Sequence, residues 1–192
     1  VQADLSKETE IKKAIQKIKA KSIKLDILIC NYGNSNFKKN NLDFYHAFNN
    51  NFFSSVNTIN HAMPILKKNT GKIICISSIC AIEAIKDAPI AYSVAKSALN
   101  NYVKSISFLL AKNKININSI APGNIYFKGS IWEKKLIKNK LKTKKYIYDN
   151  VPMNKFGNIQ EIFKLCNYLS SDNCFSTGTT YVLDGGQSRA FK

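Results

Sequence analysis

Two residues four positions apart, Tyr92 and Lys96, are the pair in this sequence best suited to proton transfer. They lie in a stretch of helical period, and a spacing of four places both side chains on one helix face. A free tyrosine has a pKa of about 10, which is too high for ready proton exchange near neutrality. A neighbouring ammonium favours the phenolate and is expected to lower this pKa. The pair therefore predicts a phenol that acts as general acid or base.

A Tyr and a Lys at this spacing occur by chance in many helices, so the pair gains weight only from what surrounds it. Polar loops follow three apolar runs, at residues 31–34, 77–78 and 121–125. In the second loop, Ser78 can hydrogen-bond a substrate oxygen on which charge develops. The carboxyl ends of parallel strands meet at one edge of a sheet, where ligands bind. We therefore expect the loops and the pair to form one site.

The elements that must position these residues alternate along the chain. Apolar runs predict buried parallel strands at residues 25–30, 72–77, 115–120 and 180–183. Helical periodicity predicts helices at residues 7–20, 42–66, 91–113 and 159–169, and a mobile, partly helical, lysine-rich excursion near 134–145. This alternation predicts an α/β fold, a Rossmann-like doubly wound parallel sheet with helices on both faces. A chain of 192 residues is expected to be a single domain.

The formal net charge of +17 raises the question of nucleic-acid binding. The excess is almost all lysine, spread along the chain, and Arg189 is the only arginine. Nucleic-acid-binding proteins favour arginine for bidentate contacts to guanine and phosphate. We therefore interpret the lysines as solvated faces and expect no nucleic-acid partner.

The cysteines and histidines give no sign of a metal site or of disulfide bonds. The five cysteines include no C-x-x-C pair, which favours reduced thiols in a cytoplasmic protein. Neither His46 nor His61 has a cluster of cysteines or carboxylates around it, so we expect no metal. No run approaches the about 18 apolar residues that a membrane span needs, and no membrane partner is expected.

Four ordered motifs carry a resemblance to a known family. They are GKIICISS at 71–78, AYSVAKSAL at 91–99, INSIAPG at 117–123 and TYVLDGG at 180–186. Together they resemble the short-chain dehydrogenase/reductase family, and within it the β-ketoacyl-carrier-protein-reductase-like branch. The resemblance covers essentially the whole chain. It implies hydride transfer between a nicotinamide cofactor, NAD or NADP, and a carbonyl or alcohol substrate that is carrier-bound, a sugar derivative or another small alcohol.

The resemblance also implies catalytic roles. Tyr92 and Lys96 match the family's catalytic pair, and Lys96 would also bind the nicotinamide ribose. Ser78 matches the catalytic serine, with Ser77 as the less favoured of the two. The family's relay asparagine, which holds a water, falls among residues 49–51, and Asn51 fits best because a small residue follows three positions later.

Further positions match the family's cofactor contacts. They are Asp4 and Leu5 beside the adenine, Asn31, Tyr32 and Gly33 beside its ribose, and Pro122, Gly123 and Ile125 at the nicotinamide carboxamide. Two positions depart from the family pattern: Tyr32 replaces an alanine, and Phe127 replaces a threonine. The first puts a large ring near the cofactor, and the second removes a hydroxyl.

Residues 124–151 are expected to form a substrate lid, in which Phe127 and Trp132 supply large apolar side chains. The ring of Trp132 either contacts substrate or packs within the lid, and the lid lysines favour an anionic substrate or an acidic carrier protein. The helices at 42–66 and 91–113 match the family's subunit contacts, which implies a homo-oligomer, a tetramer or a dimer. The alternative function is a truncated, non-catalytic subunit of the same fold that acts in oligomerisation.

The family's first strand, glycine-rich phosphate loop and first helix have no counterpart in residues 1–192. Residues 1–4 match the end of the family's third strand. We therefore expect an incomplete domain without its first two strands, from a fragment of a longer chain or a truncated product, with an exposed strand edge. The choice between NAD and NADP, usually made at the end of the second strand, stays open.

Purified residues 1–192 are expected not to bind NADH or NADPH tightly, because a helix N-terminus after the glycine-rich loop normally holds the pyrophosphate. Fluorescence titration of the reduced cofactors measures this. Saturable binding in the nanomolar to micromolar range would contradict the expectation.

Overall fold

The computed structural model describes residues 1–35, 43–68 and 70–188. Its centre is a four-stranded parallel sheet in the order β1-β2-β3-β6. The strands are β1 (Ile27–Cys30), β2 (Lys72–Ile76), β3 (Asn116–Pro122) and β6 (Thr180–Leu183), and a separate parallel pair comprises β4 (Ile125–Tyr126) and β5 (Gly157–Asn158). The predicted parallel sheet is confirmed, and every predicted strand is found.

The central strand β2 shows how the sheet is covered. Its residues 72–75 are all buried, as expected for a strand with packing on both faces. Ile73 and Cys75 join one core cluster with Leu99, whereas Ile74 joins another with Leu169. Because alternate residues of a strand point to opposite faces, these two clusters lie on opposite sides of the sheet.

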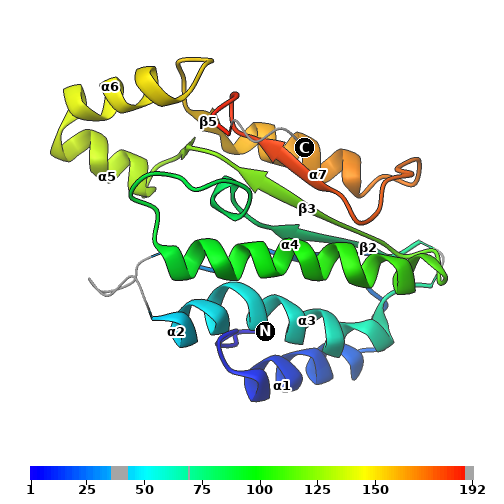
Figure 1. Cartoon of the computed structure of the whole chain (residues 1–192). Helices are drawn as coiled ribbons and strands as arrows, with labels where there is room; N and C mark the ends of the chain where they lie inside the picture. Colours follow the sequence, from blue (N-terminus) through cyan, green and yellow to red (C-terminus); the bar gives the residue numbers. More distant parts are fainter. Residues whose placement is uncertain (36–42, 69, 189–192) are drawn as a thin grey trace.

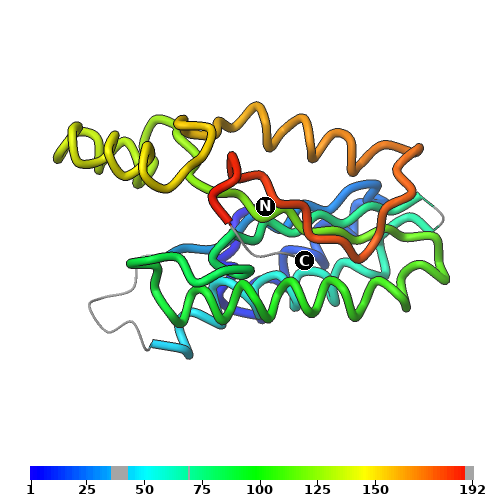
Figure 2. The backbone as a smooth tube through the Cα atoms, turned by 45° about the horizontal axis from the view of Figure 1, so that its top comes forward, coloured from blue at the N-terminus to red at the C-terminus, as the bar shows by residue number. Residues whose placement is uncertain are grey.

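Helices lie on both sides of the sheet (Figure 1; Figure 2). They include α1 (Glu8–Lys19), α3 (Ser54–Ala62), α4 (Ile90–Ala111) and α7 (Ile159–Leu169). Helices α3 and α4 pack against one face, α7 packs against the other, and α1 packs on α3. The predicted doubly wound arrangement is therefore present in these four strands and their helices.

The predicted helix at 42–66 is a composite of several helical types; its first residue, Leu42, lies outside the described residues. Helix α2 (Phe44–Phe48) runs into a π-helical turn at Asn49–Phe53, then into α3, and a 3₁₀ turn at Met63–Ile65 ends the series. A π turn inserts an extra residue and often occurs at functional sites. Here it buries Asn50 and Asn51.

The lysine-rich segment is more helical than predicted. Helix α5 (Ile131–Lys138) and helix α6 (Lys140–Asn150) pack on each other and project from the body of the molecule (Figure 1). The side chains of Ser130 and Asn139 cap them by accepting backbone N–H groups of Glu133 and Lys142. Such caps satisfy N–H groups that a helix start leaves without partners, which explains why helix formation persists despite the charge.

Residues 1–4, which are expected to match the end of the family's third strand, form no strand in this structure. A strand needs a hydrogen-bonded neighbour, and Asp4 instead bonds to residues that begin α1: its N–H donates to Glu10 and its carbonyl accepts from Lys7. In the described sheet β1 pairs with β2 alone. Its Ile27 and Ile29 are 45% and 49% exposed, which agrees with the expectation of an exposed strand edge.

No helix within residues 1–35, 43–68 and 70–188 is long and apolar enough to cross a membrane. The five cysteines are all unpaired thiols.

Substitution of Leu99 by alanine tests the packing of α4 on the sheet. Leu99 is completely buried, so Leu99→Ala is expected to lower the free energy of unfolding by about 2–5 kcal/mol. The matched control is Lys104→Ala on the same helix, where the side chain is exposed and a change within about 0.5 kcal/mol is expected. Urea denaturation measures both; equal losses would show that the helix is rotated from its described position.

Candidate active site

Tyr92, Lys96 and Ser78 meet at the carboxyl end of β2. Tyr92 and Lys96 share a face of α4, and Ser78 begins the 3₁₀ turn Ile79–Ala81 that follows β2. The hydroxyl of Ser78 lies near enough to the phenol of Tyr92 to lower its pKa, and Ser78 Oγ accepts the N–H of Cys80 at 3.2 Å. A hydrogen bond of 2.7 Å from Ser97 Oγ to the carbonyl of Ala81 holds this turn against α4.

Burial raises the pKa of Tyr92 to about 12, although the nearby hydroxyl of Ser78 opposes the rise. The expected lowering of this pKa by Lys96 is therefore wrong for the chain by itself. Desolvation disfavours the phenolate, and Lys96 makes no contribution to the shift. The phenol is consequently held protonated at neutral pH, which is the state that donates a proton.

The ammonium of Lys96 is almost fully buried, 4% exposed, and donates to the carbonyl oxygen of Ile76 at 2.7 Å. Burial lowers its pKa to about 8, and the nearby thiols of Cys75 and Cys30 act in the opposite direction. The side chain therefore remains mostly protonated at neutral pH. Since Ile76 ends β2, this bond fixes α4 to the strand that presents Ser78.

Asn51 lies next to Lys96 across the loop that follows β1. Its side-chain amide is completely buried: Nδ2 donates to the carbonyls of Asn34 and Ala47, and Oδ1 accepts the N–H of Asn34. A Cβ added at Gly33 would come within 2.6 Å of Asn51 Oδ1 and 3.3 Å of Lys96 Nζ. Only glycine leaves room here, so this loop, Asn51 and Lys96 form one close cluster.

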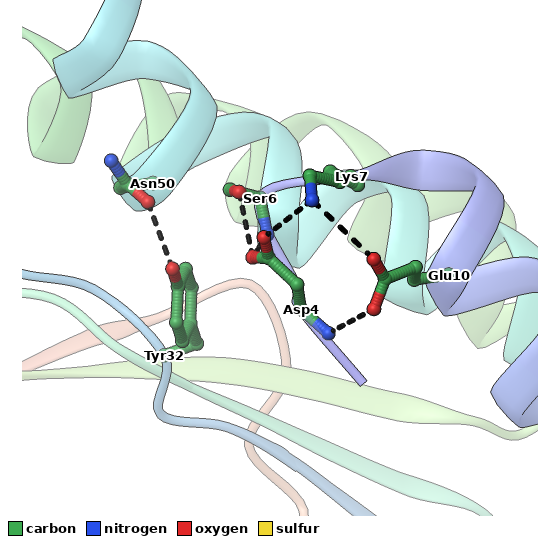
Figure 3. A network of polar contacts seen from close by, with 6 residues as sticks. All are labelled: Asp4, Ser6, Lys7, Glu10, Tyr32 and Asn50. Atoms are coloured by element: carbon green, nitrogen blue, oxygen red, sulfur yellow. Dashed lines mark hydrogen bonds and ion pairs between the residues drawn. The ribbon is translucent and has the colours of Figure 1, made fainter. Parts of the chain in front are cut away.

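The other two asparagines of the π turn have different surroundings. Asn50 Oδ1 accepts the phenolic O–H of Tyr32 at 2.9 Å (Figure 3). Asn50 Nδ2 donates to the carbonyl of His46. Asn49 is half-buried. The ring of Tyr32, which departs from the family pattern, is therefore held by the same turn that presents Asn51.

The acidic residue expected beside the adenine is tied to the start of α1 (Figure 3). The carboxylate of Asp4 accepts from the N–H and the hydroxyl of Ser6 and forms an ion pair of 3.4 Å with Lys7. The hydrogen bonds of Ser6 lower the pKa of Asp4. Leu5 lies in the same turn.

The carboxyl ends of β3 and β6 approach closely at Gly123. A Cβ there would lie 2.8 Å from the Cα of Asp184, so only glycine fits. Pro122 ends β3, and Ile125 begins β4 after a two-residue connection. Nearby, Ser77 Oγ at the end of β2 is buried and has no hydrogen-bond partner within the described part of the chain.

The two aromatic residues predicted for the lid have different positions. Trp132 stacks on Tyr146 with ring centroids 5.5 Å apart and also contacts Phe156, while Lys135 Nζ lies 4.3 Å above its ring. The ring of Trp132 therefore packs against other aromatic residues of the chain. Phe127 is 47% exposed, and its backbone N–H donates to Ser130.

A groove in the structure lies away from this cluster. It has a volume of about 530 Å³, lies between α6 and residues 154–156, and is lined by Lys144, Lys145, Ile147, Tyr148, Asn154, Lys155 and Phe156. The candidate site is therefore defined by the chemistry of its side chains. No group of three or more His, Cys, Asp or Glu side chains suited to a metal ion occurs among the described residues.

Comparison with known proteins identifies the family. The sequence model of the family described as enoyl-(acyl carrier protein) reductase matches residues 1–188. The chain belongs to the short-chain dehydrogenase/reductase family. It is accordingly an oxidoreductase of that family, and the resemblance stated from the sequence motifs is confirmed.

Three relatives within the family illustrate the similarity. The chain is 32% identical over 187 residues to the 3-oxoacyl-[acyl-carrier-protein] reductase FabG of Buchnera aphidicola, covering 92% of this chain and 72% of that protein. It resembles the RhlG/NADP complex from Pseudomonas aeruginosa with a TM-score of 0.83 and 25% identity, covering 97% and 75% of the chains. A 7α-hydroxysteroid dehydrogenase solved with NADH has the same fold, with a TM-score of 0.82, 24% identity, and coverage of 100% and 75%.

The chain is shorter than its relatives. It spans 49% of the length of one curated relative and 75% of the length of another.

The burial of Lys96 predicts a pH-dependent cost to stability. Because its pKa of about 8 lies below the ordinary value of 10.5, the folded protein disfavours the charged form, and the cost is complete below pH 8 and disappears as the pH rises to about 10.5. Between pH 7 and pH 10.5, the free energy of unfolding of wild type should therefore rise by about 2–3 kcal/mol relative to that of Lys96→Met. Urea denaturation at both pH values measures it.

The control for that experiment is Lys104→Met, which changes an exposed lysine on the same helix and corrects for the general effect of pH. A constant difference between Lys96→Met and wild type across this pH range would contradict the described burial of the ammonium.

Proposed function

We propose that this protein is an NAD- or NADP-dependent dehydrogenase/reductase that interconverts a carbonyl group and an alcohol. The observation that carries the proposal is the placement of Tyr92 and the buried ammonium of Lys96 on one face of α4, next to Ser78 at the carboxyl end of β2. A phenol kept protonated by burial, a hydroxyl next to it and a fixed positive charge are the groups that reduction of a carbonyl requires.

In the reductive direction, Tyr92 Oη gives its proton to the substrate oxygen as the carbonyl becomes an alkoxide. Ser78 Oγ donates a hydrogen bond to the same oxygen and stabilises the charge that develops on it. Lys96, whose ammonium is held by the carbonyl of Ile76, supplies a positive charge on the same face of α4 and is assigned to the nicotinamide ribose. In the oxidative direction the same groups take the proton back from the alcohol.

The cluster suits the nicotinamide half of a dinucleotide. The backbone at Gly33 and Gly123 has no room for a Cβ, and Ser77 Oγ is a buried hydroxyl without a partner in the described structure. We assign Lys96 to the nicotinamide ribose, Asn31 and Gly33 to the adenine ribose, and Pro122, Gly123 and Ile125 to the carboxamide. When bound, the nicotinamide supplies or accepts the hydride. Asn51 is the favoured relay residue, since it lies beside Lys96.

The substrate is proposed to be a 3-oxoacyl group on a carrier protein, or a sugar or other small alcohol. The similarity to a 3-oxoacyl-[acyl-carrier-protein] reductase supports the first class. The proposed substrate lid is the segment 124–151, which contains helices α5 and α6. The lysines of these helices give the lid a positive charge suited to an anionic substrate.

A homo-oligomer, a dimer or tetramer, is proposed through the outer face of α4. This face exposes large apolar side chains: Ile90, Val94, Phe108 and Leu109 are from 42% to 70% exposed. The same observation favours the second candidate function, a non-catalytic subunit that acts in oligomerisation. The intact set of Tyr92, Lys96 and Ser78 favours the enzyme, because association through α4 does not require these residues.

Tyr92→Phe tests the proposed proton donor. Loss of the phenolic O–H is expected to lower the rate of carbonyl reduction by about 10²- to 10⁴-fold, the contribution of a positioned general acid. The rate is measured on the natural protein with a 3-oxoacyl thioester and both reduced cofactors. Tyr168→Phe, an exposed tyrosine on α7, is the matched control and should keep the wild-type rate. A wild-type rate in Tyr92→Phe would remove Tyr92 from the mechanism.

A further inference from the structure

Gln187 is a buried polar side chain to which the proposed chemistry gives no role. It is 6% exposed, and both ends of its amide are bonded. Its Oε1 accepts from Nδ2 of Asn124 at 2.7 Å, and its Nε2 donates to Oη of Tyr146 at 3.3 Å. We call Asn124, Gln187 and Tyr146 the amide bridge.

The three residues of the amide bridge come from separate parts of the chain. Asn124 lies in the connection between β3 and β4, Tyr146 lies on helix α6 of the lid, and Gln187 follows the turn after β6. One amide therefore joins the lid to the β3–β4 connection and to the end of the central sheet.

The turn before Gln187 is firmly held. The carboxylate of Asp184 accepts the N–H of Gly186 at 2.9 Å, and also accepts the N–H and the hydroxyl of Ser188, each at 2.6 Å. The carbonyl of Gly185 accepts the N–H of Met153 at 3.1 Å. This turn presents the Gln187 amide in a fixed place relative to β6.

The lid, by contrast, has few anchors. Helix α5 buries no side chain, and α6 buries only Thr143 and Ile147 within the described structure. The ring of Tyr146 stacks on Trp132 of α5, with an angle of 28° between the ring planes. The amide bridge therefore contacts α6 directly through Tyr146, and it contacts α5 indirectly through the stacked ring of Trp132.

We propose that Gln187 is a positioning residue that keeps the lid and the β3–β4 connection in one relative placement. Asn124 stands between Gly123 and Ile125, so the amide that fixes α6 also fixes the backbone proposed to seat the nicotinamide. Loss of the bridge loosens both elements together. Only the kinetic consequence of this role rests on the proposed function; the structural consequence does not.

Hydrogen exchange of the α6 amides on purified residues 1–192 tests the structural part. Gln187→Leu and Tyr146→Phe each remove one hydrogen bond to the lid, which should speed exchange by about two- to tenfold. Tyr148→Phe, the matched control two residues along α6, should leave it unchanged. Unchanged exchange in Tyr146→Phe overturns the proposal, and this variant serves even where Gln187→Leu fails to fold.

The coupling itself is tested through Asn124. Asn124→Ala removes the far arm of the bridge, and should still speed exchange in α6 because Gln187 loses its second partner. The effects of Asn124→Ala and Tyr146→Phe should be non-additive, as expected for residues in one network. Trp132 is the only tryptophan in the chain, so its quenching by acrylamide reports the lid separately and should rise in each variant. Strictly additive effects would show that Gln187 does not couple the two elements.

Kinetics separate this proposal from the proposed function. In the natural protein, Gln187→Leu should raise the KM for the carbonyl substrate more than it lowers kcat, since Tyr92 and Lys96 are untouched; Gln187→Glu, which can accept from both partners, should restore the KM. A wild-type protein without carbonyl reductase activity would refute the proposed function while the exchange results still stand. An active protein with unchanged KM in Gln187→Leu would overturn the positioning role.

Discussion

The buried hydrogen bond from Lys96 to the carbonyl of Ile76 is the interaction on which the rest of the site depends. It places a positive charge at the carboxyl end of β2 and locks α4 against the strand that presents Ser78. Burying an ammonium costs free energy unless it is hydrogen-bonded, and the lowered pKa of Lys96 expresses that cost. If α4 rotated or slid along the sheet, the Lys96 ammonium would be exposed to solvent or would lose its hydrogen bond. The bond to Ile76 therefore fixes Tyr92 on α4 relative to Ser78, which follows β2.

Much of this arrangement could be predicted from the sequence, because it depends on short-range patterns. Continuous apolar runs predicted the strands, and the spacing of Tyr92 and Lys96 predicted their shared helix face. Three features could not be predicted in this way. The pKa of Tyr92 depends on how deeply the phenol is buried, which only tertiary packing sets. The π turn at Asn49–Phe53 adds one residue to a helical repeat. The conformation of residues 1–4 depends on which hydrogen-bonding neighbours are available.

The lid shows a different limit. Its lysines predicted a loosely organised excursion, yet side-chain caps at Ser130 and Asn139 and the stacking of Trp132 on Tyr146 organise two helices. Gln187 belongs to no sequence motif, so the sequence alone does not predict its role; its burial and its hydrogen bonds with Asn124 and Tyr146 indicate that role. The catalytic candidates Tyr92, Lys96 and Ser78 belong to sequence motifs, whereas the proposed role of Gln187 depends on contacts that only the structure shows.

The central claim is that Tyr92 and Ser78 converge on one substrate oxygen beside Lys96. A crystal structure of the natural protein with a nicotinamide cofactor and an alcohol or carbonyl ligand tests it most directly. The account predicts that the ligand oxygen lies within hydrogen-bond distance, about 2.5–3.2 Å, of both Tyr92 Oη and Ser78 Oγ, with Lys96 still bonded at Ile76. A ligand oxygen held by other residues, with Tyr92 turned away from it, would contradict the account.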